Sequence, residues 1–215
     1  MPELPEAEVA ARQLRERVVG ATVRDCWIGR EDIVREGLPS LDQYRQAKIA
    51  GVERKGKSVI LHFLCGKEPR FLVAELGMTG LLLFRSTLTK HPQHTHFILH
   101  LDGCCEPDIR YWNPRRFGRL SLLDRAGLDR YVARRFGHDP LTISHEKFLR
   151  VLRATRSRLK SLLMHQQVIA GIGNIYANEI LFRSCLHPDQ PANTIPGKSI
   201  VRLHQVMGEV LREAI

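Results

Sequence analysis

The chain contains 215 residues, of which 43% are hydrophobic and 26% are charged, with a formal net charge of +10 at pH 7. This composition excludes a disordered chain, and no apolar run approaches the roughly 20 residues of a membrane-spanning helix. The first residues are acidic, at Glu3 and Glu6, and lack a secretion signal, so we expect a cytoplasmic protein. The positive charge attracts polyanions and is spread over segments that include 52–57, 113–119 and 153–160, which favours nucleic acid over an anionic membrane.

The chain opens with MPELPEAEVA, which predicts a first helix. Pro5 suits the first turn of a helix, acidic residues suit its positive end, and Gly20 suits the position after its end. Residues 6–19 would then be helical, which leaves Pro2 and Glu3 without an explanation.

From residue 21 to about 124 the chain is rich in short β-like runs that alternate with turns. The runs cover residues 21–29, 57–64, 71–77, 80–85, 96–102 and 119–124. Many short strands with local turns predict an antiparallel β-sandwich or barrel.

Helical spacing replaces this pattern further along the chain. Helices are predicted over residues 125–137, 144–154, 158–166, 175–185 and 196–215. In the last of them one face is apolar, with Ile200, Leu203, Met207 and Val210. The sequence thus predicts an α+β fold in which an N-terminal helix and an antiparallel β-sandwich form a domain of residues 1–130. An all-helical domain of residues 131–215 follows.

The cysteines and histidines do not form a strong metal-binding pattern. The five cysteines have no CxxC spacing, and an odd number without a framework suits reduced thiols in a cytosol. The one histidine cluster is HPQHTH, with His91, His94 and His96, and the strand-like residues after it would place His94 and His96 on one face. We therefore predict no metal and no cofactor in this chain, with the histidine cluster as the alternative.

The first residues also have a chemical interpretation. Initiator methionine is readily removed before proline, which would expose Pro2 as a secondary amine with a pKa of roughly 8, against about 10.4 for lysine. Such an amine can attack a sugar or carbonyl carbon and form an imine-type intermediate, and Glu3 beside it could donate or shuttle a proton. The alternative is that both residues only begin the first helix.

The segment GIGN, from Gly171 to Asn174, interrupts the helical pattern. Glycines allow a tight turn, and free N–H groups at the start of the next helix can hold a phosphate. The alternative is a helix–turn–helix corner that packs only on itself. A dinucleotide-binding loop is not indicated, because no strand precedes the segment and a third glycine is lacking.

Two further segments carry residues suited to entering a DNA duplex. In NPRRFG, Arg115 and Phe117 could fill the space of an unstacked base, as inserted arginines and apolar wedges do. In LGMTG, Met78 lies next to glycines, which is a poor setting for a core residue. The alternative for the first segment is a β-turn at Pro114 with Phe117 turned into the core.

Five segments occur together in the order of a known family: PELPEAE, KGK around Lys57, LGMTG, NPRRFG and GIGNIYANEILF. The chain resembles the formamidopyrimidine-DNA glycosylases, bacterial enzymes that excise oxidised purines from DNA, over essentially its whole length. Leu4 stands where the sister family, endonuclease VIII, typically has a glycine, so the resemblance is to the formamidopyrimidine branch. It implies that the helical domain contains a helix–two-turns–helix motif.

The resemblance implies catalytic roles for particular residues. Pro2 would be the nucleophile that attacks the deoxyribose carbon bearing the damaged base, and Glu3 would protonate the ring oxygen or assist imine formation. Glu6 would lie near the flipped base. Lys57, in a β-turn, would contact the lesion phosphate and donate a proton during strand cleavage.

The resemblance also implies positions that contact DNA. Met78, Arg115 and Phe117 would fill the gap left by the extruded nucleotide, with Arg115 facing the orphaned cytosine. Asn174 would hold a backbone phosphate at the glycine turn. His94 matches a DNA-contact position of the family, the alternative being a solvated or strand-packed histidine.

The chain departs from the family pattern at several positions. Glu75 replaces a histidine, and its carboxylate would repel a phosphate, while Asn113 and His165 each replace a typical aspartate. The chain ends at Ile215, before the lesion-covering loop and the four-cysteine zinc finger of the family. We therefore expect a fragment, with zinc only in the absent finger.

The resemblance thus implies a base-excision-repair DNA glycosylase with abasic-site lyase activity. It would act as a monomer in the bacterial cytoplasm and nucleoid, on double-stranded DNA that contains oxidised bases or abasic sites. One amine nucleophile accounts for both activities, because an imine makes the neighbouring sugar hydrogens acidic and permits β- and then δ-elimination. A non-catalytic module that binds damaged DNA is the alternative, because the finger is absent.

Overall fold

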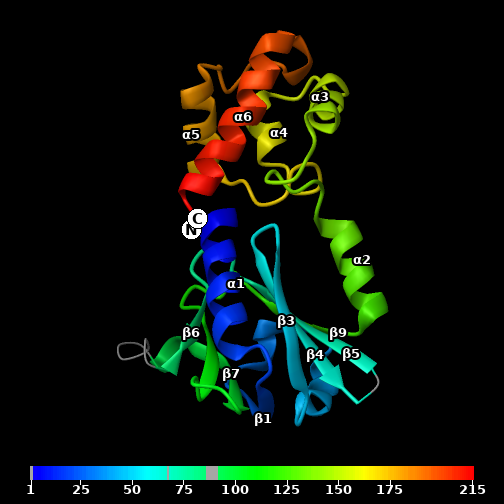
Figure 1. Ribbon diagram of the computed structural model, residues 1–215, viewed down its shortest axis with the longest axis vertical. Helices are drawn as coiled ribbons and strands as arrows, with labels where there is room; N and C mark the ends of the chain where they lie inside the picture. The colour runs from blue at the N-terminus through cyan, green and yellow to red at the C-terminus, as the bar shows by residue number, and fades with distance from the viewer. Residues whose placement is uncertain (1, 67, 86–91) are drawn as a thin grey trace. The chain divides into compact units, whose positions relative to one another are not determined.

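The computed structural model describes residues 2–66, 68–85 and 92–215 (Figure 1). They divide into two compact units. The N-terminal unit contains Pro2 and Ala7–Tyr131, and the helical unit contains Glu3–Glu6 and Val132–Ile215. The predicted α+β class, with a first helix and an antiparallel β domain ahead of an all-helical domain, is confirmed.

Helix α1 (Leu4–Val18) forms as predicted, with Pro5 in its first turn. Gly20 follows its end with φ +94°, a left-handed conformation that glycine adopts without strain. One face of α1 is buried in the core of the N-terminal unit and consists of Ala7, Ala11, Leu14 and Val18.

Strands make up most of the N-terminal unit. In chain order they are β1 (Thr22–Ile28), β2 (Val34–Glu36), β3 (Lys48–Lys55), β4 (Ser58–Cys65), β5 (Glu68–Glu75), β6 (Leu81–Phe84), β7 (Thr95–Asp102), β8 (Asp108–Trp112) and β9 (Leu120–Leu123). They form one sheet in the order β2-β9-β5-β4-β3-β1-β7-β8-β6. Each described pair is antiparallel except β2 with β9.

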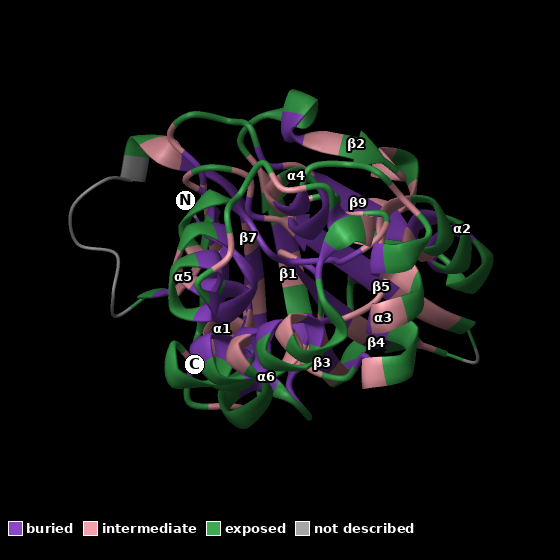
Figure 2. Ribbon diagram, turned by 90° about the horizontal axis from the view of Figure 1, so that it is seen from above, coloured by how far each residue is buried: buried purple, intermediate pink, exposed green. Residues whose placement is uncertain are grey.

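The sheet encloses a single core. The sheet has two parts, one formed by β2, β9, β5, β4 and β3 and the other by β1, β7, β8 and β6. β1 and β3 are paired at one position, Thr22 with Lys48, so few ladder bonds join these two parts. Side chains from both parts pack together, among them Leu99 from β7 and Leu61 and Leu72 from β4 and β5. Figure 2 shows the corresponding buried segments along β5, β7 and β9.

Three strands, β2, β3 and β8, were not predicted from the sequence. β3 reads KIAGVERK, and only Ile49 and Val52 of it are buried, so charged residues and a glycine hide its alternation. β8 begins at Asp108, directly after a segment whose proline and acidic residues predict a turn. Pairing with neighbouring strands supplies the preference that these short sequences lack.

The helical region begins with α2 (Arg125–Arg135), which crosses the division between the units. The helical unit contains α3 (His145–Arg153), α4 (Leu159–Leu163), α5 (Asn174–Ser184) and α6 (Gly197–Glu213). The predicted apolar face of α6 is confirmed by the burial of Ile200, Leu203, Met207 and Val210. Within the described ranges, none of the helices combines the length and hydropathy that a bilayer crossing requires.

Candidate active site and DNA-binding loops

Glu3 is fully buried against the start of α5, although 170 residues separate it from Gly173 in the sequence. Its Oε2 accepts N–H bonds from Gly173 (2.7 Å) and Tyr176 (3.3 Å), and its Oε1 accepts one from Ile175 (3.0 Å). Unpaired N–H groups and the helix dipole favour a negative charge at this position. The three bonds compensate for the burial of the carboxylate and fix its orientation.

The loop before α5 places these donors. Gly171 has φ +106°, and its carbonyl accepts the Leu4 N–H (3.0 Å). The side-chain amide of Gln166 spans the loop: Oε1 accepts from Gly171 N (2.8 Å), and Nε2 donates to the carbonyls of Ile172 (2.8 Å) and Met164 (2.7 Å). These three bonds hold residue 166 and the loop after it in a non-helical conformation, and α4 (Leu159–Leu163) ends before the predicted range of 158–166 does. Gln166 was not singled out from the sequence, because one glutamine ahead of a glycine loop has no distinguishing pattern.

Gln166→Ala is expected to lower the free energy of unfolding by about 2–3 kcal/mol, because each of its partly buried hydrogen bonds contributes about 1 kcal/mol. Gln167→Ala is a matched control, since the Gln167 amide donates one exposed bond, to the Arg134 carbonyl (2.9 Å). Its expected loss is at most about 1 kcal/mol. Urea unfolding measures both variants, and equal losses would contradict the role given to Gln166.

Asn174 begins α5 and is exposed to solvent. The preceding residue, Gly173, is the N-cap and has an extended backbone (φ −122°, ψ −159°). As a glycine it offers no side-chain capping bond. The N–H groups of Gly173, Ile175 and Tyr176 are occupied by Glu3, so an anion that approaches from solvent meets the exposed Asn174 rather than these donors. The predicted phosphate contact at Asn174 is compatible with this position and stays a prediction.

Glu6 is held through both of its carboxylate oxygens. Oε1 accepts the Tyr176 hydroxyl (2.8 Å), and Oε2 accepts the backbone N–H of Glu3 (2.8 Å). Burial raises the pKa of the Tyr176 phenol, and the bonded carboxylate raises it further, so the hydroxyl remains a donor. Pro2, which precedes Glu3, is buried, and Met1 lies outside the described residues.

Lys57 occupies the tip of the β3–β4 hairpin. Lys55 pairs with Ser58, so Gly56 and Lys57 form a two-residue turn, as the resemblance implied. Gly56 has φ +56°, which suits the first turn position of such a hairpin. The turn therefore presents a half-buried lysine between the ends of two strands.

Met78 and Phe117 are exposed on two neighbouring loops. Phe117 is 57% exposed and Met78 is 37% exposed, so the alternative in which Phe117 packs in the core is wrong. The Thr79 hydroxyl joins the loops, because it accepts the Arg115 N–H (3.4 Å) and donates to Asn113 Oδ1 (3.3 Å). The Arg115 guanidinium lies 5.1 Å from the centre of the Phe117 ring, within reach of a cation–π interaction.

Asn113 is fully buried and organises the loop that carries Phe117. Its Oδ1 accepts the Arg116 N–H (3.0 Å), and its Nδ2 donates to the Tyr111 hydroxyl (3.0 Å) and the Gly118 carbonyl (3.4 Å). The Tyr111 hydroxyl in turn donates to a backbone carbonyl (2.6 Å). An ionised aspartate has no N–H for these two acceptors, so the amide suits this site.

Two protein-family models match the chain. The model of the formamidopyrimidine-DNA glycosylase N-terminal domain matches residues 1–120, and that of the formamidopyrimidine-DNA glycosylase H2TH domain matches residues 136–215. The chain belongs to the formamidopyrimidine-DNA glycosylase family. A glycosylase of this name from Thermomicrobium roseum is 36% identical over 100% of this chain and 78% of its own length. One from Thermus thermophilus is 37% identical over 100% of this chain and 76% of its own.

Solved structures of the family also match. The Lactococcus lactis formamidopyrimidine-DNA glycosylase bound non-covalently to DNA with an AP site has a TM-score of 0.87 and 27% identity, covering 99% of this chain and 81% of that one. The wild-type Lactococcus lactis enzyme with DNA containing N7-benzyl-Fapy-dG has a TM-score of 0.88 and 27% identity, covering 100% and 79%. The resemblance stated from the sequence is confirmed, and with it a DNA glycosylase of base-excision repair.

Glu75, the departure from the family's histidine, is paired within the N-terminal unit. Its Oε1 accepts bonds from Arg35 Nη1 (2.9 Å) and from the Tyr131 hydroxyl (2.8 Å). Burial raises the pKa of Tyr131, and the Glu75 charge raises it further, so the phenol remains a donor. The cation beside Glu75 reduces the repulsion of a phosphate that its carboxylate alone would exert.

The structure corrects the expected placement of two histidines. His94 ends the 3-10 helix η4 (Pro92–His94), ahead of β7, so it does not share a strand face with His96. The His94 ring lies edge-on to Trp112 at 6.0 Å between ring centres. His96 is buried with Nε2 3.0 Å from a backbone carbonyl, and burial lowers its pKa, which favours the neutral ring. His91 lies outside the described residues.

The metal-binding side chains of the described residues do not gather into a site. Among residues 2–66, 68–85 and 92–215, no three His, Cys, Asp or Glu side chains gather in a way that could hold a metal ion. The cysteines are free thiols: Cys26, Cys65, Cys104, Cys105 and Cys185. The zinc that the resemblance implies therefore has no fitting donor set in the described part of the chain.

A hollow of about 470 Å³ beside Arg116 has a basic and partly aromatic lining. Trp27, which is 45% exposed, and Arg30 contribute to it. Asp32 lies 2.9 Å from Arg30 and 3.8 Å from Arg116, which keeps the two guanidinium groups together. An exposed ring among cations suits contact with nucleic acid, and sequence reasoning singled out neither Trp27 nor Arg30.

Proposed function

We propose that the chain is a bifunctional enzyme, a DNA glycosylase that removes formamidopyrimidine and 8-oxoguanine and an abasic-site lyase that cuts the backbone. The observation that supports this most directly is the buried carboxylate of Glu3, fixed by three backbone N–H groups next to Pro2 in the chain. A terminal secondary amine with a fixed carboxylate beside it supplies a nucleophile and a proton-transfer group.

In this mechanism the Pro2 nitrogen attacks C1′ of the deoxyribose, and the damaged base leaves with the electron pair of the glycosidic bond. Glu3 takes the proton that the Pro2 nitrogen loses after the attack and passes it to the ring oxygen as the ring opens, which gives an iminium ion between Pro2 and C1′, while the departing base takes its proton from water. The iminium acidifies the hydrogens on C2′, so β-elimination expels the 3′ phosphate and δ-elimination then expels the 5′ phosphate. Hydrolysis of the remaining linkage returns the free amine.

The proposed DNA contacts are those that the resemblance to the family implies, and the exposure of Met78 and Phe117 supports them. Met78, Arg115 and Phe117 fill the space of the extruded nucleotide, because extrusion costs a few kcal/mol and inserted side chains offset that cost. Lys57 binds the phosphate at the lesion, and Asn174 binds a second backbone phosphate.

The remaining assignments complete the proposal. Glu6 lies near the flipped base, and His94 contacts the DNA backbone. The substrate is double-stranded DNA with oxidised bases or abasic sites, and the protein acts as a monomer in the bacterial cytoplasm.

Lys57→Ala is expected to weaken binding to abasic-site DNA and to slow strand cleavage, since a phosphate contact is lost. The slope of log affinity against log salt should fall by about 1. Lys55→Ala is the matched control, because Lys55 is an exposed lysine of the same hairpin and lies outside the turn. Titration at several salt concentrations measures the slope, and an unchanged slope for Lys57→Ala rejects the phosphate contact.

Reduction by borohydride in the presence of abasic-site DNA tests the proposed mechanism. Protein with a free Pro2, verified by intact mass, should form a covalent adduct, and protein that retains Met1 should form none, because an amide nitrogen is not nucleophilic. No adduct from the free amine would reject the lyase. If that protein still prefers damaged over undamaged DNA, the non-catalytic binding module is its function.

A further inference from the structure

Arg54, near the end of β3, has an almost fully buried guanidinium, with 6% of its side chain exposed. Its Nε donates to Glu8 Oε2 (2.9 Å), and its Nη1 donates to the carbonyl of Gly56 (3.3 Å). Burial of a charged group costs free energy unless it is paired, so these bonds offset the cost of placing Arg54 inside the fold. An ordinary surface ion pair does not account for this arrangement.

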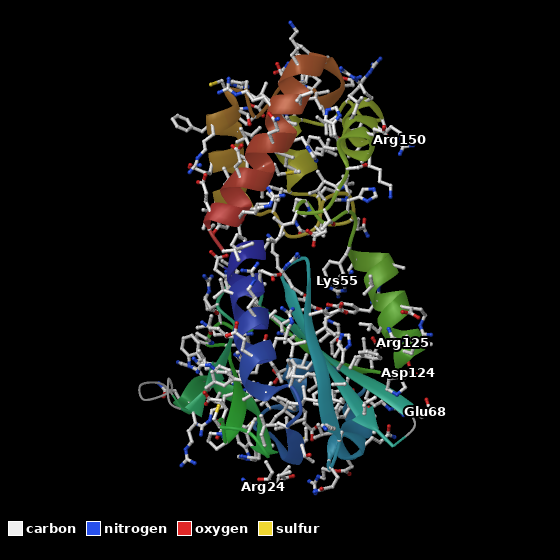
Figure 3. All side chains as sticks on the ribbon, in the orientation of Figure 1. Arg24, Lys55, Glu68, Asp124, Arg125 and Arg150 are labelled. Carbon is white, nitrogen blue, oxygen red and sulfur yellow. The ribbon has the colours of Figure 1, made fainter. Side chains whose placement is uncertain are left out.

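The carbonyl of Gly56 belongs to the peptide unit that leads into Lys57. Because a peptide unit is planar, holding this carbonyl also orients the backbone nitrogen of Lys57. Hairpin tips are otherwise among the more mobile parts of a fold. Figure 3 labels Lys55, which marks the β3 side of this tip.

Glu8, the second partner of Arg54, lies on α1. It also accepts a bond from Arg12 Nε (3.0 Å). Burial acts to raise the pKa of Glu8, but the bonds and charges of Arg54 and Arg12 outweigh it, so the pKa is lowered and the carboxylate is ionised at neutral pH. One guanidinium thus connects the helix that follows Pro2 to the turn that carries Lys57.

We propose that Arg54 is a positioning residue for the lyase reaction, an inference that rests on the proposed function. Its two bonds fix the Lys57 turn relative to α1, so that the Lys57 ammonium holds the lesion phosphate while the Pro2 amine attacks the sugar. Pro2, Glu8, Arg54 and the turn all belong to the N-terminal unit, which allows this coupling to act within one compact body. Arginine suits the task because its N–H groups point in fixed directions, whereas a lysine ammonium is a single point charge.

Arg54→Lys tests the inference, since it keeps a cation for Glu8 and removes the second fixed donor. The single-turnover rate of β-elimination on an abasic-site duplex should fall about tenfold, because small misplacements of a positioned group slow catalysis. Arg12→Gln is the matched control: Arg12 bonds the same carboxylate, is 54% exposed, and should leave the rate within about twofold of the wild type. Arg15 Nε donates to the Val52 carbonyl (3.0 Å), a contact between α1 and β3 that none of these substitutions removes.

A double-mutant cycle separates positioning from a merely structural role. In a Lys57→Ala background, Arg54→Lys should change the elimination rate by less than about twofold, because its effect passes through Lys57. The inference would be overturned by a wild-type elimination rate for Arg54→Lys. It would also be overturned if the rate of the double variant fell by the product of the two single-variant factors. Should thermal unfolding show that Arg54→Lys does not fold, Glu8→Ala, which removes the acceptor that connects Arg54 to α1, carries the same cycle with the same criterion.

The wild-type protein distinguishes failure of this inference from failure of the proposed function. A wild-type borohydride adduct together with multiplying effects rejects the role of Arg54 alone. Absence of an adduct rejects the lyase, and the cycle is then measured by affinity for abasic-site DNA. There, Arg54→Lys and Lys57→Ala should each lower the salt slope by about 1, and the double variant should lower it no further.

Discussion

Glu3→Gln is expected to lower the rate of borohydride trapping on abasic-site DNA at least about 100-fold, as loss of a positioned proton-transfer group does. It should also lower the free energy of unfolding by about 2–4 kcal/mol, because buried N–H donors are left unpaired. Both carboxylate oxygens of Glu3 accept backbone N–H bonds at the start of α5, whereas a glutamine amide would turn an NH₂ group towards one set of donors. Trapping yield against time and urea unfolding measure the two effects.

Glu6→Gln is the control for this substitution. Its oxygens accept from the Tyr176 hydroxyl and from the Glu3 N–H, and a hydroxyl can accept as well as donate. A glutamine can therefore keep both contacts, and the expected loss of stability is at most about 1 kcal/mol. Trapping by Glu3→Gln at the rate of Glu6→Gln would show that the charge of Glu3 has no part in the chemistry.

The parts of the fold that were predicted from the sequence are those encoded locally. α1 and α6 each repeat apolar residues at helical spacing, and each carries this face into a core. β4 and β5 are apolar runs bounded by turns, and both form. β3 was missed because its sequence is charged and it exists through its pairing with β4, which local preference does not report.

The contacts that organise the candidate site are non-local, and sequence reasoning could not supply them. Glu3 was assigned to proton transfer, but its partners are backbone N–H groups about 170 residues away. A backbone donor has no residue type, so no sequence pattern marks it. Gln166 was not predicted as a site residue either. Its contacts are local, but its amide pairs with backbone groups, which no residue type marks in the sequence.

The exposed loops show a different limit of the sequence. Composition could not decide whether Phe117 enters the core or faces solvent, because a phenylalanine after a proline turn suits either position. In the structure the buried Asn113 amide bonds to Tyr111 before the loop and to Gly118 after it, and Phe117 is exposed to solvent. The exposed position of Phe117 thus depends on the buried Asn113, which the sequence marks only as a departure from the family pattern.

Gly171→Ala is expected to lower the free energy of unfolding by about 3 kcal/mol or more, because left-handed strain of about 1–2 kcal/mol adds to overpacking of about 1–3 kcal/mol. Gly171 has φ +106°, and a Cβ there would lie 2.8 Å from both Cβ and Cδ1 of Leu4. Leu4 is fully buried and donates its N–H to the Gly171 carbonyl, so neither side can move freely. Urea unfolding measures the loss.

Gly197→Ala supplies the comparison, because Gly197 begins α6, has no left-handed φ, and has no atom within 4 Å of an added Cβ. Alanine there should change stability by no more than about 1 kcal/mol, in the stabilising direction that helix preference gives. The contrast also bears on the candidate site, since displacing Leu4 displaces Glu3 from its donors at α5. Gly171→Ala should therefore lose borohydride trapping under conditions where it remains folded, whereas Gly197→Ala keeps it. Equal trapping by the two folded variants would mean that the loop does not hold Glu3 in place.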